Sequence, residues 1–239
     1  MIHGYATSET LLEVPGHRVR MTRVADSEAL LADIEPVTFA EDERLPYWAE
    51  LWPSAVALAH FIAKYLNLDG WRILELGCGL GLVGVVAALQ GARVLCTDYE
   101  EAALAFARRN ARGNACRGMR FRLVDWCRPA LRRRYDCILA SDVIYEARSF
   151  GPLAALLQRY LARGGMAVLA EPGRVNAPPF FTLLRQRGFT YRKHIQRVHW
   201  EGAHRISIYV IRHARAAALP CHLPKDVPYP RSPGGRGPG

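Results

Sequence analysis

The most informative run of the chain reads Arg72-Ile-Leu-Glu-Leu-Gly-Cys-Gly-Leu-Gly-Leu-Val-Gly84. It begins with a short apolar stretch typical of a buried strand. The alternating glycines that follow predict a turn in which a ligand can lie against bare backbone, because glycine accepts positive φ without a steric penalty. Leu82 to Leu89 then opens a helix. A strand, a glycine loop and a helix in this order predict a nucleotide-binding βα unit, although the GxGxxG spacing of Gly79, Gly81 and Gly84 is weak evidence by itself.

The βα pattern continues along the rest of the chain. Short apolar runs alternate with amphipathic stretches, which indicates strands covered by helices. The predicted strands span 72–77, 93–98, 119–124, 135–141, 165–171, 189–198 and 205–212, and the predicted helices span 82–90, 100–111, 150–162 and 178–187. This alternation predicts an α/β fold: a doubly wound, mostly parallel seven-stranded sheet with helices on both faces.

Two further elements precede the glycine loop. Apolar residues recur at three and four positions between Trp48 and Tyr65, which predicts a helix with Pro53 in its first turn, where proline is tolerated. The β-like stretches Leu11 to Val14 and Val19 to Val24 flank Pro15-Gly16 and predict a hairpin. We therefore expect an N-terminal extension over 1–44, the main domain over 45–213, and a disordered tail rich in Pro, Gly and Arg over 214–239.

Composition narrows the class of protein. With 239 residues, of which 50% are hydrophobic and 23% charged, the chain fits one α/β domain with a short appendage. It has no apolar run long enough to cross a membrane and no secretory signal, so we expect a cytoplasmic protein. The six cysteines form no CxxC pair, which argues against disulfides and against a bound metal.

The formal net charge of +10 raises the possibility of nucleic-acid binding. The arginines are spread along the chain, however, and the densest run, Arg132 to Arg134, falls in a predicted surface loop. A solvated surface is the favoured interpretation of this run, and attraction to an acidic protein partner is the next.

Acidic residues at the predicted strand ends bear on the choice of cofactor. Asp98 ends the second strand, where it can accept both hydroxyls of a ribose in either a dinucleotide or S-adenosylmethionine. Glu75 would repel a pyrophosphate but attract an amino group, which favours S-adenosylmethionine. Asp125 and Trp126 follow the third strand, and a carboxylate beside an aromatic ring suits adenine, although Trp126 can also be a core residue.

Longer segments carry a resemblance to a known family. The glycine-loop region resembles the signature of class I methyltransferases. Pro46-Tyr-Trp-Ala-Glu-Leu-Trp-Pro-Ser54, Asp125-Trp126 and Ser141-Asp-Val-Ile-Tyr145 resemble the seven-β-strand protein-lysine methyltransferases of methyltransferase family 16. Glu171-Pro-Gly-Arg174 is similar to a segment of the branch that methylates the electron-transfer flavoprotein β subunit. Val143, Ile144 and Glu171 depart from that branch, and other branches are nearer at 143 and 144.

The resemblance implies a function and a set of site residues. It implies S-adenosylmethionine as the cofactor and a lysine of a protein as the acceptor. The cofactor-binding residues would be Trp52, Glu75, Gly77, Cys78, Gly79, Asp98, Tyr99, Asp125, Trp126 and Ser141. Asp142 would dock and orient the acceptor lysine, and Tyr145 would contact its nitrogen. Tyr47 is either a packing residue or part of the acceptor channel.

Three alternatives remain at this stage. The same cofactor core serves small-molecule amine N-methyltransferases with acceptors such as nicotinamide. A nicotinamide-dinucleotide oxidoreductase would use a similar glycine loop, although Glu75 argues against it. A non-enzymatic binding scaffold is the third, and it leaves the acidic residues and Tyr145 unexplained.

Overall fold

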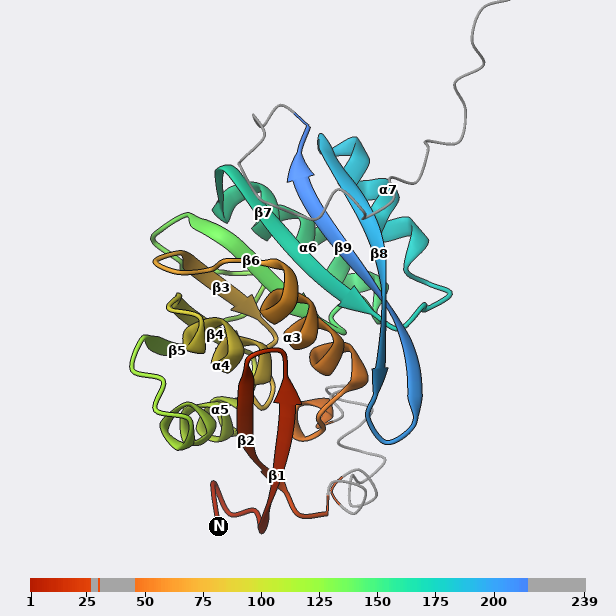
Figure 1. Ribbon diagram of the computed structural model, residues 1–239. Coiled ribbons are helices and arrows are strands. Elements are labelled where there is room, and N and C mark those ends of the chain that lie inside the picture. The colour runs from red at the N-terminus through yellow and green to blue at the C-terminus, as the bar shows by residue number, and fades with distance from the viewer. Residues whose placement is uncertain (27–29, 31–45, 215–239) are drawn as a thin grey trace, which may run out of the picture.

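A computed structural model describes residues 1–26, 30 and 46–214, and its centre is a seven-stranded sheet (Figure 1). The strand order is β5-β4-β3-β6-β7-β9-β8. The five strands from β5 to β7 are parallel, and β9 runs antiparallel to both β7 and β8. The bounds are β3 Arg72–Leu76, β4 Arg93–Asp98, β5 Met119–Leu123, β6 Tyr135–Ser141, β7 Leu161–Glu171, β8 Phe189–His199 and β9 Ala203–His213. The predicted doubly wound, mostly parallel sheet is confirmed.

Helices cover both faces of the sheet, as the continuous apolar strands require. One face carries α3 Pro53–Tyr65, α4 Leu82–Leu89 and α5 Glu101–Gly113, and the other carries α6 Ala147–Tyr160 and α7 Pro178–Gln186 (Figure 1). The alternation of side chains along β3 shows the division, because Ile73 is buried on the α3–α5 side and Leu74 on the α6–α7 side.

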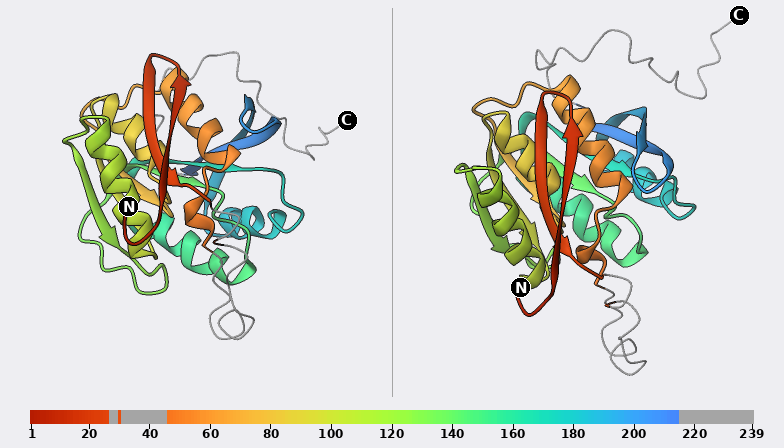
Figure 2. Two further views of the ribbon diagram at one scale, coloured as in Figure 1. Left: turned by 90° about the horizontal axis from the view of Figure 1, so that it is seen from below. Right: turned by 60° about the horizontal axis from the view of Figure 1, so that its bottom comes forward.

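The N-terminal hairpin packs outside the first helical layer (Figure 2). Its strands are β1 Thr7–Val14 and β2 His17–Val24, which confirms the predicted hairpin. Asn110 of α5 fastens it: its Oδ1 accepts a hydrogen bond from the Thr22 amide at 2.6 Å, and its Nδ2 donates to the Thr22 carbonyl at 3.0 Å. The same Nδ2 donates to the carbonyl of Leu80 at 2.9 Å, so one buried side chain joins the hairpin to the glycine loop.

Several element boundaries differ from the sequence prediction by up to five residues; β1, for example, begins at Thr7 and not at Leu11. Tyr47–Ala49 forms a separate 3-10 helix, η1, and α3 begins only at Pro53, because proline lacks an N–H and suits the first helical position. Strand β7 begins at Leu161, directly after α6, whereas the sequence predicted a helix to 162 and a strand from 165.

The predicted boundary at 44 lies outside the described residues, and the boundary at 214 coincides with the last of them. The proposed division into extension, domain and tail therefore stays a prediction. Within the described residues, no helix has both the length and the apolar character needed to cross a bilayer.

Candidate functional site

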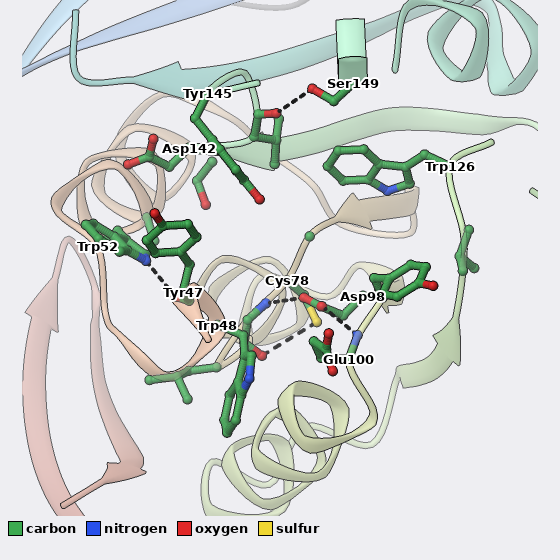
Figure 3. A pocket seen from close by; sticks show the side chains of 18 of the residues that line it. Tyr47, Trp48, Trp52, Cys78, Asp98, Glu100, Trp126, Asp142, Tyr145 and Ser149 are labelled. Carbon is green, nitrogen blue, oxygen red and sulfur yellow. Dashed lines mark hydrogen bonds between the residues drawn. The ribbon is translucent and has the colours of Figure 1, made fainter. Parts of the chain in front are cut away.

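A cavity of about 480 Å³ opens where β3, β4 and β6 end (Figure 3). The chain order reverses here, because β3 lies between β4 and β6, and open α/β sheets bind ligands at such a point. The volume is within the range of small-molecule sites, roughly 300–1,000 Å³. The predicted site residues that line the cavity are Trp52, Gly77, Cys78, Gly79, Asp98, Tyr99, Asp125, Trp126, Ser141, Asp142 and Tyr145.

The glycine loop forms the floor of the cavity. Gly77 and Gly79 have φ values of 62° and 50°, which disfavour residues with a side chain. A Cβ at Gly79 would lie 3.3 Å from the Trp48 carbonyl oxygen, and one at Gly77 would lie 3.1 Å from Val143 Cγ1. The loop therefore presents bare backbone to a ligand, as the sequence predicted.

Asp98 fastens this loop to the end of β4. Its Oδ2 accepts a hydrogen bond from the Gly79 amide at 2.8 Å, and its Oδ1 accepts one from the Glu100 amide at 3.1 Å. Burial raises the pKa of Asp98, while these amides act in the opposite direction. Each carboxylate oxygen has more than one lone pair, so Asp98 can hold the loop and still accept a hydroxyl from a ligand.

An aromatic wall follows β5. Trp126 is half-buried, and its ring lies against the glycine loop, 3.5 Å from where a Cβ on Gly77 would be. Figure 3 shows Trp126 across the cavity from Trp52 and Tyr47. Asp125 is exposed, and its Oδ1 accepts a hydrogen bond from the Cys127 amide at 2.8 Å.

Glu75 is placed differently from the sequence prediction. It is 3% exposed and is absent from the cavity lining. Its carboxylate points toward α4, into space left by the missing side chain of Gly84, and accepts a hydrogen bond from the Cys96 thiol at 3.0 Å. Burial raises the pKa of Glu75 to about 8. A raised pKa favours the protonated form, which would not attract an amino group by charge, and the role of Glu75 in cofactor binding stays a prediction.

The same buried region gathers potential metal ligands that the sequence spacing did not reveal. The ligand atoms of Glu75, Cys78 and Cys96 all lie within 4.8 Å of one another. Burial raises the pKa of the Cys96 thiol, which favours the protonated form. The prediction that the protein binds no metal stays a prediction.

Asp142 lies just beyond β6 in a restricted conformation. Its φ is 56°, an uncommon value that Asp and Asn adopt more readily than most residues, and its amide donates to the Ala170 carbonyl at 2.9 Å. Its Oδ1 accepts a hydrogen bond from Arg174 Nε at 2.9 Å, and its Oδ2 accepts one from Ser54 Oγ at 3.4 Å. Burial raises the pKa of Asp142, and the contact with Arg174 opposes that effect.

Aromatic side chains line the same part of the cavity as Asp142 (Figure 3). The rings of Tyr47 and Tyr145 meet edge to face with centroids 5.6 Å apart, and those of Tyr47 and Trp52 do so at 5.9 Å. Trp52 Nε1 donates to the Tyr47 carbonyl at 2.7 Å, which fixes its ring. Burial raises the pKa of Tyr145 to about 12, so its hydroxyl remains a hydrogen-bond donor at neutral pH.

Sequence reasoning did not single out three residues near the site. Glu100 lines the cavity beside Asp98, while Ser54 and Arg174 contact Asp142 from outside the lining. Ser54 and Arg174 both lie in quoted family segments, but neither segment indicated a contact with Asp142. These contacts join residues 88 and 32 positions apart, so they depend on the tertiary fold.

Comparisons with known proteins identify chains that are similar to this one. A family model described as lysine methyltransferase matches residues 32–187. The chain is 34% identical over 176 residues to Protein N-lysine methyltransferase METTL21A of Danio rerio, covering 70% of this chain and 78% of that protein. It is 30% identical over 186 residues to EEF1A lysine methyltransferase 3 of Mus musculus, covering 75% and 78%. Magnesium protoporphyrin IX methyltransferase from Synechocystis PCC 6803, solved with bound S-adenosylmethionine, shares the fold at a TM-score of 0.53 and 19% identity, with coverages of 77% and 89%.

Proposed function

Because the chain belongs to the lysine methyltransferase family, we propose that it transfers a methyl group from S-adenosylmethionine to a lysine side chain of a protein substrate, in the cavity described above. The main support for this proposal is that one cavity holds both a candidate cofactor site and a candidate acceptor site. A bare glycine loop with Asp98 lies at one side, and Asp142 with Tyr145 lies at the other. The first half suits a nucleoside cofactor and the second suits a cationic acceptor.

In this proposal, different cavity residues bind different parts of the cofactor. The backbone of Gly77 and Gly79 accommodates its amino-acid portion, Asp98 accepts the ribose hydroxyls, and Trp126 provides a face for the adenine. Glu75 supports the loop from behind, consistent with its burial against Cys96. The cofactor supplies a methyl group on a sulfonium, which is already a good leaving group. The protein's main task is therefore alignment of the acceptor.

The acceptor half of the cavity must position the lysine and also allow its ammonium group to lose a proton. A lysine with its usual pKa near 10.4 is charged at pH 7, and forming its neutral amine costs roughly 4–5 kcal/mol. The aromatic walls formed by Tyr47, Trp52 and Tyr145 reduce that cost by removing the ammonium from water. Asp142 docks the incoming cation, and Tyr145 contacts its nitrogen.

Labelling a cell extract tests the function. Purified protein with tritiated S-adenosylmethionine is expected to label a protein band, and mass spectrometry of that band should show methyllysine. Asp142→Asn keeps the shape and tolerates positive φ, so we expect at least a 100-fold loss of labelling with cofactor affinity within about threefold of wild type. Asp136→Asn is the matched control, because Asp136 lies on β6, the strand that ends just before Asp142, but pairs with Arg72 away from the cavity.

The outcome of this assay also separates the alternatives. The relatives named above are protein-lysine methyltransferases, which disfavours a small-molecule acceptor. Label confined to the small-molecule fraction would contradict the proposal, and so would full labelling by Asp142→Asn. The expected cytoplasmic location is a separate proposal, and fractionation of cells that express the tagged protein tests it.

A further inference from the structure

Arg174 contacts the acceptor half of the cavity without lining it. It lies in the loop after β7, and its Nε and Nη2 both donate to Oδ1 of Asp142. The other oxygen, Oδ2, accepts only a long hydrogen bond of 3.4 Å from Ser54 among the described residues, and Asp142 lines the cavity. Arg174 occupies one carboxylate oxygen of Asp142, and the other oxygen is available to an acceptor. Arg174 can therefore influence the acceptor through Asp142.

The position of Arg174 is built by a second buried acid. Glu171 is 1% exposed, and its Oε2 accepts hydrogen bonds from the amides of Gly173 at 2.6 Å and Arg174 at 2.8 Å. Its Oε1 accepts one from the Tyr209 hydroxyl at 3.3 Å. The guanidinium carbon also lies 5.8 Å from the centroid of the Tyr145 ring, within the range of a cation–π contact. Glu171 thus holds the backbone of the loop, and the side chain of Arg174 points toward Asp142.

A negative Asp142 by itself would create a chemical conflict. The carboxylate attracts the charged lysine, but it also stabilises the ammonium form, whereas methyl transfer requires the lone pair of the neutral amine. We propose, on the basis of the proposed function, that Arg174 is a positioning residue that balances the charge of Asp142, so that a docked lysine can lose its proton near neutral pH.

The other groups around Asp142 do not supply this balance. Glu171 at the end of β7 adds negative charge, and Ser54 on α3 is neutral. Tyr145, in the loop after β6, stays protonated, and Glu146 and Arg148, which lie beyond it, act with opposite signs on that tyrosine. In the part of the chain that the structure describes, Arg174 is the cation in hydrogen-bonding contact with Asp142.

The pH dependence of methylation distinguishes this role from a structural one. The acceptor is the protein band that the wild-type enzyme labels in a cell extract, kept limiting, with initial rates measured between pH 6.5 and 10. For Arg174→Gln, we expect the alkaline pKa of the rate profile to rise by about one unit, which gives about a tenfold loss at pH 7 and recovery toward the wild-type rate near pH 10. Arg174→Lys keeps the charge and should stay within about threefold of wild type at pH 7.

Arg72→Gln is the matched control, because Arg72 also pairs with an aspartate, Asp136, but away from the cavity. Its profile should match that of wild type. Thermal shifts with S-adenosylmethionine verify that each variant folds and binds the cofactor. Should Arg174→Gln fail to fold, Arg174→Met carries the same expectation, since it also removes the charge.

Each result has a clear meaning. An equal loss at every pH would assign Arg174 a purely structural role and overturn the inference, as would a wild-type profile in the variant without the charge. Labelling by the wild type with an unshifted variant profile would leave the proposed function standing. Absence of protein labelling by the wild type would overturn both.

Discussion

Replacing Glu75 with glutamine should remove a pH dependence from the stability of the protein. The carboxyl group is buried between β3 and α4, and burial raises its pKa from 4.5 to about 8. The folded protein therefore holds a proton that the unfolded chain releases above pH 4.5. The stabilisation is fully present below about pH 4.5 and is lost as the pH rises through about 8.

The size of the effect follows from the two pKa values. At 1.36 kcal/mol per pH unit, a rise from 4.5 to about 8 corresponds to roughly 5 kcal/mol of free energy of unfolding. Relaxation around a newly charged buried group reduces this, so we expect wild type to lose about 2–5 kcal/mol between pH 5 and pH 8.5 relative to Glu75→Gln. Glutamine has nearly the shape of the protonated acid and does not ionise.

Urea unfolding at a series of pH values measures this difference. Glu101→Gln is the control, because Glu101 is an exposed acid on α5, and its curve should run parallel to that of wild type. The reasoning is refuted if Glu75→Gln is less stable than wild type by a constant amount at every pH. A tenfold loss of S-adenosylmethionine affinity in Glu75→Gln would show instead that the carboxylate turns into the cavity and binds the amino group, as the sequence predicted.

Three further substitutions, one of them paired with a control, test the supports of the site. Asn110→Ala should cost about 2–4 kcal/mol of unfolding free energy in urea, because it leaves the Thr22 amide and carbonyl without their buried partner. Gly84→Ala should cost about 1–3 kcal/mol, since its Cβ would overlap the buried carboxylate behind it, whereas Gly113→Ala on α5 meets open space and should stabilise by about 0.5–1 kcal/mol. Trp126→Ala should weaken S-adenosylmethionine binding by about tenfold in calorimetry, through loss of roughly 1–3 kcal/mol of stacking.

Local patterns in the sequence were sufficient for most of the fold. Apolar runs and helical periodicity depend on neighbouring residues, so the predicted strands and helices fall close to the observed ones. Two of the shifted boundaries, those of α3 and β7, lie where local preference is ambiguous. At Pro53 the chain follows a turn before the helix, and at Leu161 an apolar residue suits both the helix that ends there and the strand that begins.

The direction of Glu75 was a missed signal. Side chains alternate along a strand, so Glu75 must share the face of Ile73, which a helix covers. Gly84 lies in that helix, and in such a tightly packed layer its missing side chain leaves room for a carboxyl group. Strand parity and one helical glycine therefore pointed toward burial, whereas proximity to the glycine loop suggested the cavity.

The partner of Asp142 could not be found in this way, because it depends on which strands are neighbours. Ser141 and Ala170 pair across β6 and β7, which brings the residues after both strands to the same edge of the sheet. Knowing that pairing, one would expect a side chain from the loop after β7 to reach Asp142, and Arg174 does so. The sequence contains both loops but not the order of the strands.

The three acids around the glycine loop and the acceptor end show why strand order matters for the chemistry. Each buried carboxyl group offsets the cost of leaving water in a different way. Glu75 favours the protonated form, Asp98 accepts hydrogen bonds from amides of the loop, and Asp142 pairs with the guanidinium of Arg174. Of the three, only the third places a cationic side chain beside a carboxylate that faces the cavity. A site that must bind a charged lysine and then use its neutral form needs a carboxylate whose charge is already partly balanced, and a protonated acid or an amide-bound one would not meet both demands.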